Sequence, residues 1–534
     1  MKFAPDVGMA IKLPMIMLML FFLSFSLLAH DVPDSDIFMD DECPFGDYLF
    51  FEEHVGITIT GALHTTQQMA VVTREDIELR VAPDIAALLQ EALGLNLVRY
   101  GPHGNQTGIS LRGFDSRRVA FLVNGIPANS PLDGRFDIFQ IDPNSIERIE
   151  IIYGGSDSRF NVSAALGGVI NIVTIARQAP EFRFGFSVSN TSAMPGRYRG
   201  RDGQVHGPRF EDLLDTQNYA ISFGYGGGMF SATANVFYNR AGNRFLAEDN
   251  LGITRRSDNN EVWDTGAAVS LLWELPNFTR LISSSRFYYG DRNFPSAQFS
   301  REFGNQQDTT YRQSFMLEMP RIFHDNLATE VSFTFDMARR TFADSGNAVS
   351  QHNQHAISVI NRWSWYANGI FTLRSGFDFT FTQLESTEMG TRGRHDGGLH
   401  LATEIRLGRR FFIVPSISAV ATSGGTTEVV PVPKFGLLWN ITDTVSIRNN
   451  YFRSFKFPGF QELYWTGAGG YGNPDLLPQD GWGTDLGVTW SPNRRVRLES
   501  VFFAQWTRNS IHWFHAGGGI WMPENVGGSV FCWP

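Results

Sequence analysis

The second half of the chain is organised by an alternation of apolar and polar residues. In the segment EVSFTFDM, every second residue is apolar and the others are polar: Val331, Phe333, Phe335 and Met337 against Glu330, Ser332, Thr334 and Asp336. The segments FSATANVFY, LHLATEIRL and RVRLESVFFAQW alternate in the same way. A period of two residues is typical of a β-strand with one apolar and one polar face. About sixteen such segments follow residue 180, so the pattern predicts a large antiparallel sheet.

The lengths of the connections between these segments indicate that the sheet lies in an outer membrane. Short turns such as WELPNFTR alternate with longer polar stretches such as MPGRYRGRDGQVHGPRFEDLLDTQ. Outer-membrane β-barrels carry short turns on one rim and long loops on the other. A secreted β-sandwich or propeller can also alternate, but the many aromatic strand ends favour the membrane. We therefore predict a mainly β protein, with a transmembrane antiparallel β-barrel at residues 177–534.

The N-terminus reads as an export signal. Lys2 and Lys12 precede an unbroken apolar run from Leu13 to Ala29, and the chain then becomes polar at once. This order predicts a signal peptide at residues 1–29. An uncleaved membrane anchor is the competing interpretation, because the run reaches the lower limit of a spanning helix. Residues 30–54 are acidic and without a pattern, as in a flexible leader.

Between these regions the pattern is that of a compact α/β unit. Thr73 and Asp76 form a helix-capping signal, and APDIAALLQEALG has apolar residues at helical spacing before a glycine. Short apolar strands follow, separated by Gly, Asn and Pro turns. The pair Asn124-Gly125 supplies the positive φ angles of a two-residue hairpin turn. Residues 62–176 are thus expected to fold as a small domain of their own.

Composition agrees with a sheet of half-buried strands. Charged residues make up 18% of the chain, against about 25% in typical soluble domains, and aromatic residues make up 13%, with 46 Phe. The net charge of −10 argues against nucleic acid as a partner. The two cysteines, Cys43 and Cys532, are too few for a disulfide framework.

Four stretches of the α/β unit carry a family resemblance. ISLRGF, VAFLVNGIPAN, IERIEIIYGG and ALGGVINIVT, in this order and spacing, resemble the plug domain of TonB-dependent outer-membrane receptors. The resemblance implies a plug inside a barrel of about 22 strands, which imports scarce ligands with energy relayed by TonB. One departure is the pair Phe160-Asn161, where the family usually has Tyr-Gly.

A second stretch of the chain resembles the same family. YFRSFKFPGFQELYWTGAGGYGNPDLLPQD is similar to a signature that precedes the last quarter of such barrels. Haem receptors of the family carry a ligand His between its two turns, and this sequence has none there.

The resemblance also implies a site for the energising partner. Residues 55–61, within the stretch HVGITITGA, resemble the TonB box, an extended segment that pairs with TonB as an added strand. The residues assigned to it are Gly56, Ile57, Thr58, Ile59 and Thr60. A first strand of the plug is the alternative interpretation of the same alternating residues.

By the same resemblance, ligand contacts are expected on two plug loops, GPHGNQTG and ANSPLDGRF. The candidate residues are His103, Asn105, Gln106, Asn129, Asp133 and Arg135. Polar residues and glycines are also ordinary loop components, so this assignment has a neutral alternative.

A plug in a polar lumen needs charged groups on its surface and an apolar core of its own. Arg112 and Arg148 are predicted to contact acids of the barrel, with Asp485 or Glu499 as candidates for Arg112. Solvated surface arginines are the alternative. The core of the plug is expected from Val119, Phe121, Val123, Ile149, Ile151, Ile170 and Ile172.

No motif supports an enzyme, a cofactor or a resident metal. The chain lacks a Gly-Lys-Ser/Thr phosphate loop, H-E-x-x-H and Gly-x-Ser-x-Gly. His352 with His355, and His512 with His515, have a spacing that suits a metal on a helix. In SIHWFHAGG the context is a strand, where that spacing gives opposite faces.

The sequence therefore predicts a monomeric outer-membrane receptor for the uptake of a ferric siderophore, cobalamin or similar metal chelate. Its expected partners are TonB with its inner-membrane complex, the chelate and outer-membrane lipids. The alternative is a degenerate or truncated receptor that acts as a non-transporting barrel or adhesin. The segment SVFCWP fits no closing strand, and about six strands of the family are missing, so we expect an incomplete barrel.

Overall fold

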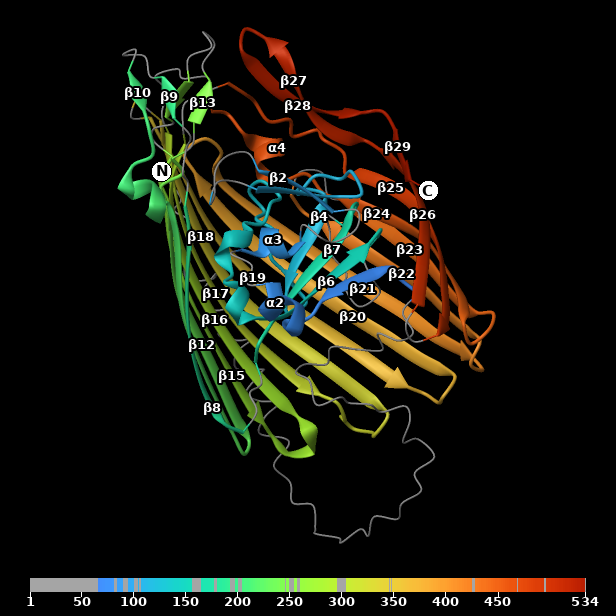
Figure 1. Ribbon diagram of the computed structural model, residues 1–534. Helices are drawn as coiled ribbons and strands as arrows, with labels where there is room; N and C mark the ends of the chain where they lie inside the picture. Colours follow the sequence, from blue (N-terminus) through green and yellow to red (C-terminus); the bar gives the residue numbers. More distant parts are fainter. Residues whose placement is uncertain are drawn as a thin grey trace, which may run out of the picture. The chain divides into compact units, whose positions relative to one another are not determined.

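In the computed structural model, two bodies of β-structure form one unit, and the larger sheet curves around the smaller (Figure 1). The structure describes these residues: 66–80, 84–89, 95–99, 104, 107–155, 165–176, 180–192, 197–199, 204–244, 246–248, 254–256, 260–294, 304–344, 346, 348–424, 428–467, 469–493 and 496–533. The predicted signal peptide, acidic leader and TonB box lie outside the described residues, as does the Phe160-Asn161 pair.

The smaller body is the plug, and its centre is a five-stranded sheet in the order β1-β6-β7-β4-β5. The strands are β1 (Met69–Val72), β4 (Val119–Val123), β5 (Ile126–Pro127), β6 (Ile146–Tyr153) and β7 (Gly168–Thr174). Strands β4 and β7 pair in parallel and the other neighbours are antiparallel. All seven apolar residues expected in the plug core lie in one buried cluster. The expected core of the plug is therefore confirmed.

Short helices and a separate hairpin complete the plug. They are α2 (Arg74–Arg80), α3 (Ile85–Leu89), the hairpin of β2 (Leu95–Arg99) with β3 (Thr107–Leu111), and the 3-10 helices η1 (Ile138–Gln140) and η2 (Pro143–Ser145). Thr73 caps α2 as predicted, because its hydroxyl accepts the Asp76 N–H while the Asp76 carboxylate accepts the Thr73 N–H. Ile85, Leu88 and Leu89 bury the apolar face of α3.

A tight turn joins β4 to β5. Asn124 and Gly125 have φ angles of 52° and 74°, which is the left-handed pair that the Asn-Gly sequence predicts. The Asn124 side chain donates to Thr174 Oγ1 and accepts from the Thr174 N–H, so the turn is tied to the end of β7. The turn is therefore anchored to the neighbouring strand of the plug.

The larger body is a sheet of sixteen strands among the described residues, all neighbours antiparallel. This agrees with the count of about sixteen alternating segments. In spatial order the strands are β8 (Phe182–Thr191), β11 (Thr216–Gly227), β12 (Phe230–Ala241), β15 (Val262–Glu274), β16 (Arg280–Phe294), β17 (Gly304–Met319), β18 (Leu327–Asp344), β19 (Val349–Tyr366), β20 (Phe371–Ser386), β21 (Gly390–Leu407), β22 (Phe411–Thr422), β23 (Glu428–Asn440), β24 (Val445–Lys456), β25 (Gln479–Asn493), β26 (Val496–Arg508) and β29 (Ser529–Trp533). Within the described residues, no ladder joins β8 to β29.

The two faces of this sheet differ as the alternation predicted. On β18, Ser332 and Thr334 are buried towards the plug, whereas Met337 is 41% exposed on the outer face. Rings on the outer face form two rows across neighbouring strands: Tyr219, Tyr238, Trp263 and Tyr289 in one, and Tyr225, Phe230 and Trp273 in the other. Aromatic rows at both borders of an apolar band are a feature of outer-membrane barrels.

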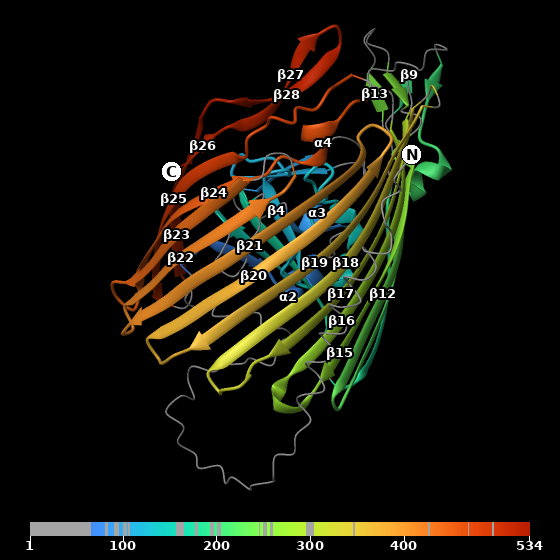
Figure 2. The same ribbon diagram turned by 180° about the vertical axis from the view of Figure 1, so that it is seen from behind.

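The strands end on two different rims (Figures 1 and 2). One rim carries short connections such as 275–279, which includes η4 (Pro276–Phe278), 367–370 and 441–444. The other rim, the long-loop rim, carries 457–478 with α4 (Phe460–Tyr464), and 509–528 with the hairpin of β27 (Ser510–Gly517) and β28 (Ile520–Val526).

Smaller elements also belong to the long-loop rim. They are β9 (Tyr198–Arg199) with β10 (Val205–His206), η3 (Phe210–Leu214), and β13 (Leu246–Glu248) with β14 (Thr254–Arg256). Among the described helices, none has the length and apolar character needed to cross a bilayer.

Candidate functional site

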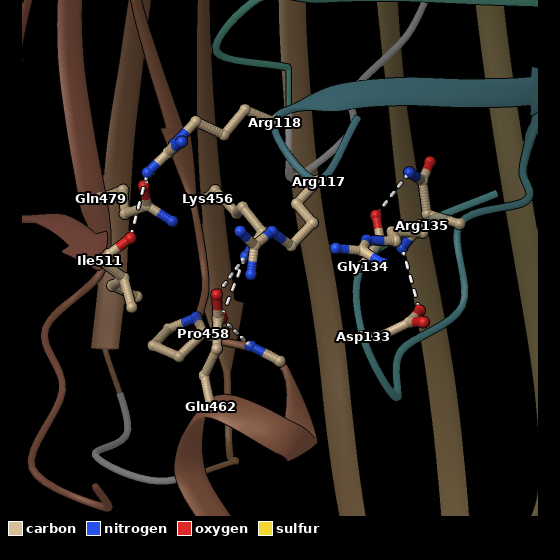
Figure 3. A network of polar contacts seen from close by, with 12 residues as sticks. Arg117, Arg118, Asp133, Gly134, Arg135, Lys456, Pro458, Glu462, Gln479 and Ile511 are labelled. Atoms are coloured by element: carbon tan, nitrogen blue, oxygen red, sulfur yellow. Dashed lines mark hydrogen bonds and ion pairs between the residues drawn. The ribbon is translucent and has the colours of Figure 1, made fainter. Parts of the chain in front are cut away.

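A plug loop at residues 128–137 faces the long-loop rim and is held in shape from within. The Asn129 side-chain oxygen accepts the Phe121 N–H at 2.7 Å, and its amide nitrogen donates to Val119 and Gly134 carbonyls at 3.0 and 2.9 Å. Gly134 has a φ of 76°, which a side chain would strain. Because both amide hydrogens of Asn129 are used inside the plug, this residue builds the loop. The loop presents Asp133 and Arg135 to the lumen (Figure 3).

Helix α4, from the long connection 457–478, docks onto this plug loop. The backbone N–H groups of Phe460 and Gln461 donate to the carbonyls of Pro131 and Leu132 at 3.1 and 2.9 Å. Leu132 and Phe460 also share a buried apolar cluster with Leu384 and Met389. A barrel loop and a plug loop thus form one continuous structure at the long-loop rim.

An ion pair fixes the start of α4 (Figure 3). Lys456 Nζ lies 3.1 Å from Glu462 Oε2, and the same carboxylate accepts the Gly459 N–H at 2.7 Å. Burial raises the pKa of Glu462, but attraction to Lys456 and the Gly459 hydrogen bond outweigh burial, so the net pKa is lowered. Glu462 is therefore ionised at neutral pH and holds α4 on the plug.

The RGFDSRR turn of the plug also reaches the long-loop rim. Arg118 donates to Gln479 Oε1 at 2.8 Å and to the Ile511 carbonyl at 3.1 Å, which links the plug to β25 and β27 (Figure 3). Burial raises the pKa of Asp115, but Arg118 and Arg117 lower it by more, so this carboxylate stays charged. The crowded charges of this turn are therefore structural links to the barrel.

Between the plug loop and the barrel wall lies a cavity of about 310 Å³. Plug residues 127–131 and 133–137 line one side, and the inner faces of β16 to β21 line most of the other. The lining contains seven cationic side chains, Arg135, Arg286, Arg292, Arg312, Arg340, Arg394 and Lys456, and five carboxylates, Asp133, Asp137, Asp336, Asp378 and Asp396. Its size is near the lower end for small-molecule sites in proteins.

Several of these charges pair across the plug–barrel boundary. Arg340 of β18 donates to Asp133 of the plug at 2.9 Å and to Asp308 at 2.8 Å. Arg292 of β16 pairs with Asp137 of the plug. Arg394 pairs with Asp396 at 2.8 Å and donates to the Pro458 carbonyl at 3.1 Å. These pairs neutralise one part of the cavity.

Another part of the cavity carries more positive than negative charge. Arg286, Arg312 and Asp336 are direct cross-strand neighbours on β16, β17 and β18. Arg312 pairs with Asp336 at 2.5 Å, but its buried Nη1 has no hydrogen-bond partner. Within the described part of the chain, the guanidinium groups of Arg286 and Arg135 also have no ion-pair or hydrogen-bond partner. Two adjacent guanidinium groups therefore share one carboxylate, an arrangement that an anion would stabilise.

On the opposite wall, the plug is joined to the barrel by a buried ion pair. Arg112 Nη1 lies 2.5 Å from Asp485 Oδ1 of β25, and the side chains are 6% and 3% exposed. The Arg112 guanidinium also lies over the rings of Phe503 and Tyr153, at 4.4 and 5.1 Å from their centres. Asp485 is the first of the two partners suggested by the sequence, whereas Glu499 pairs with Arg448.

Arg148 has a different partner from the barrel acid that was expected. Its Nε lies 2.9 Å from Glu150, two residues along the same strand, so the ion pair is internal to the plug. Residues two apart point to the same face of a strand, which gives Arg148 a carboxylate without reaching the barrel.

Half of the candidate ligand residues lie at the cavity. Asn129, Asp133 and Arg135 all line the cavity, whereas His103, Asn105 and Gln106 lie outside the described residues. His352 and His355 lie on strand β19 and not on a helix, so they point to opposite faces. Within the described residues, no cluster of three His, Cys, Asp or Glu side chains could hold a metal.

Sequence reasoning missed Arg286, Arg312 and Asp336 as members of the cavity. Asp336 lies on the polar side of the alternating segment EVSFTFDM, so its lumen orientation was predictable. The strand of Arg286 alternates less clearly, because Ser283 and Ser285 lie on the face opposite to it. The grouping of the three cavity residues depends on the register of three strands, and a sequence alone does not state that register.

Comparisons with known proteins agree with this architecture. The TonB-dependent receptor plug domain family matches residues 62–169, and the TonB-dependent receptor-like β-barrel family matches residues 184–530. The vitamin B12 transporter BtuB of Vibrio vulnificus is 22% identical over 477 residues, 85% of this chain and 70% of that protein. BtuB of Photobacterium profundum is 25% identical, over 77% of this chain and 62% of that protein.

Solved structures with the same fold include two receptors of other ligands. The ferric enterobactin receptor PfeA of Pseudomonas aeruginosa, as a point mutant in complex with enterobactin, has a TM-score of 0.69 and 17% identity, covering 87% of this chain and 78% of that one. The Serratia marcescens hemophore receptor HasR has a TM-score of 0.69 and 13% identity, covering 88% and 79%. At these identities the likeness is one of fold.

The family match covers most of the chain, and the plug, the alternating sheet and the aromatic rows are the parts that this family combines. The chain therefore belongs to the TonB-dependent receptors, which are non-enzymatic β-barrel proteins of the outer membrane.

Proposed function

We propose that this protein binds a metal chelate with anionic groups and takes it up across the outer membrane with energy from TonB. The observation that supports the anionic class is the row Arg286, Arg312 and Asp336, in which one carboxylate faces two guanidinium groups. A ferric siderophore with carboxylate or catecholate oxygens is the ligand class that this row favours.

The chemistry of arginine supports this choice. A guanidinium group carries its donors in a planar fork that matches two adjacent oxygens of one anion. Arg312 Nη1 is buried and unpartnered, and Arg135 and Arg286 line the same cavity. An anionic oxygen of a bound chelate would reduce the repulsion between Arg286 and Arg312. The role proposed for Arg135 is to close over the ligand from the plug side.

Cobalamin is the second candidate, because the relatives of 22% and 25% identity are vitamin B12 transporters. Cyanocobalamin is neutral and rich in amides, so it would use uncharged hydrogen-bonding groups. The cavity offers Gln140, Gln306 and Gln354 for that purpose. The comparisons give no support to a non-transporting adhesin.

Binding of three probes to the purified protein in detergent separates these ligand classes. We expect ferric enterobactin, a trianionic complex, to bind more tightly than haem, which has two carboxylates, and haem more tightly than neutral cyanocobalamin. Arg286→Gln and Arg312→Gln should each weaken ferric enterobactin binding about tenfold to a hundredfold, because a hydrogen bond to a charged group contributes about 1.5–3 kcal/mol.

The matched control is Arg280→Gln, which alters an arginine of the same strand β16 outside the cavity. It should leave binding within about twofold of the unaltered protein. Tight cyanocobalamin binding that is insensitive to both cavity variants would contradict the anionic class and favour cobalamin.

A further inference from the structure

A second cavity, of about 70 Å³, continues the first along the same wall of the barrel. The two cavities share three lining residues: Pro127 of the plug, and Asp378 and Thr380 of β20. The shared residues form a neck between the cavities. Polar side chains surround the neck: Ser358 on the side of the first, upper cavity, and Arg362 and Ser416 on the side of the second, lower cavity.

The second cavity leads away from the long-loop rim. On β19, the upper cavity touches Gln354 and Ser358, and the lower one touches Arg362 and Ser364, close to the end of the strand at Tyr366. Strand β20 runs in the opposite direction, and there the lower cavity reaches Arg374, four residues into the strand. Together, the cavities follow the inner wall across most of the strand length.

The tip of the β4–β5 hairpin lies at the neck between the two cavities. Arg312 Nη2 donates to the Pro127 carbonyl at 2.9 Å, and Arg362 Nη2 donates to the Gly125 carbonyl at 2.9 Å. Each arginine also binds a barrel carboxylate, Asp336 for Arg312 and Glu330 for Arg362. Two barrel arginines thus hold the hairpin tip against β17 and β19.

The opposite wall holds the plug by buried contacts. Arg112 is paired with Asp485, and Gln505 of β26 donates to the Leu166 carbonyl at 2.8 Å in a buried bond. The β4–β5 tip differs because its two barrel contacts are each a single hydrogen bond beside a cavity. The plug loop at 128–137 is held to β18 by the Arg340–Asp133 pair, so the hairpin tip is the part of the plug at this wall whose movement would join the cavities.

The hairpin tip is also connected through hydrogen bonds to β6, the strand that pairs with β1. The Gly125 N–H donates to Asn171 Oδ1 at 2.9 Å, and Asn171 Nδ2 donates to Glu150 Oε2 at 3.0 Å. Glu150 lies on β6, directly opposite Val71 of β1. Removal of β1 would expose β6, whose Glu150 accepts the hydrogen bond from Asn171 that in turn holds the tip.

We propose that the ligand route runs along the inner face of β19, β20 and β21, and that the β4–β5 tip is its gate, held by Arg312 and Arg362. This inference rests on the proposed uptake function. Arg312 belongs to both parts, because it lines the larger cavity and its Nη2 holds the gate. Asp378 and Thr380 line the neck that opens when the tip moves.

The gate is tested by ion conductance in planar bilayers, which requires no ligand and is thus independent of the ligand class. The test variant has lysine at both positions, Arg312→Lys with Arg362→Lys. Each lysine keeps the positive charge opposite Asp336 or Glu330. A single ammonium group replaces the planar guanidinium, which binds a carboxylate and a hairpin carbonyl at the same time. We expect this double variant to conduct at least tenfold more than the unaltered protein. The double glutamine variant should conduct as well.

The matched control is Arg453→Lys, since Arg453 also binds a carboxylate, Asp480, and a carbonyl, Pro431, but both lie in the barrel. It should stay closed. Heat-modifiable migration in gels establishes that each variant is assembled. If both double variants remain as closed as the control, the gate assignment is wrong.

A thiol test locates the route within the open variant. In a background with Cys43→Ser and Cys532→Ser, a negatively charged methanethiosulfonate reagent should reduce the conductance by more than half at Ser416→Cys, which lines the lower cavity. Ser284→Cys on β16, outside both cavities, should be modified without this loss. Block at Ser284→Cys but not at Ser416→Cys would place the route on another wall and overturn the proposal.

Discussion

Replacing Asp485 by leucine is expected to loosen the plug within the barrel strongly, because it breaks a buried ion pair between the two. The change leaves the Arg112 guanidinium buried, at 6% exposure, without its carboxylate. Loss of one partner of a buried ion pair typically costs about 3–5 kcal/mol. Hydrogen exchange of buried plug amides such as that of Phe121 should therefore accelerate about a hundredfold to a few thousandfold.

Two further variants isolate the ion pair from the loss of the side chain. The double variant Arg112→Leu with Asp485→Leu removes both charges and should recover much of the protection, because no unpaired charge stays buried. Glu181→Leu disrupts an exposed pair with Arg183 and should change exchange little. Equal exchange in Asp485→Leu and the unaltered protein would exclude a role for this pair in plug docking.

Proline at Ile57 or Ile59 is expected to abolish energy-dependent uptake while leaving ligand binding intact. Proline lacks the backbone N–H and breaks the pairing of an extended segment with an added partner strand. The assignment of this segment to the TonB box is a proposal from the sequence, since residues 55–61 lie outside the described residues.

The measurement is the uptake of radioactive iron bound to enterobactin in cells, together with binding to the same cells in the cold. Ile57→Val is the matched control, because it keeps the backbone donor and the apolar face. Normal uptake in both proline variants would place the TonB contact elsewhere in the chain.

The main features of the fold were predictable because they depend on local periodicity. The period of two placed Ser332 and Thr334 towards the lumen and Met337 on the outer face, as observed. The Asn124-Gly125 turn was predictable from the φ angles that the pair permits. The plug core followed from strands whose alternating residues are large and apolar, such as Phe121 and Ile170.

The candidate site was only partly predictable, because it depends on contacts between distant residues. Asp133 and Arg135 were expected near the ligand from the position of their loop, and both line the cavity. Arg112 and Asp485 are 373 positions apart, so the sequence supported Asp485 only as one of two candidates. The grouping of Arg286 with Arg312 requires the register between β16 and β17, which no local pattern determines.

The docking of α4 was also beyond the reach of sequence reasoning. The segment FQELY was identified as part of a signature, but its contacts with Pro131 and Leu132 are backbone hydrogen bonds. Such bonds leave no trace in residue type. The structural role of Asn129 was not visible in the sequence for a related reason, because its amide bonds to backbone groups of the plug.

The central claim is tested most directly by the uptake of iron-55 bound to enterobactin in cells that produce this protein as their only receptor for the complex. The measurement compares otherwise identical cells with and without TonB, and with and without a proton-motive-force uncoupler. We predict accumulation only in energised cells that contain TonB, with surface binding unchanged in all cells. Binding without accumulation in energised, TonB-containing cells, or equal accumulation without TonB, would contradict the assignment as a TonB-energised importer of an anionic iron chelate.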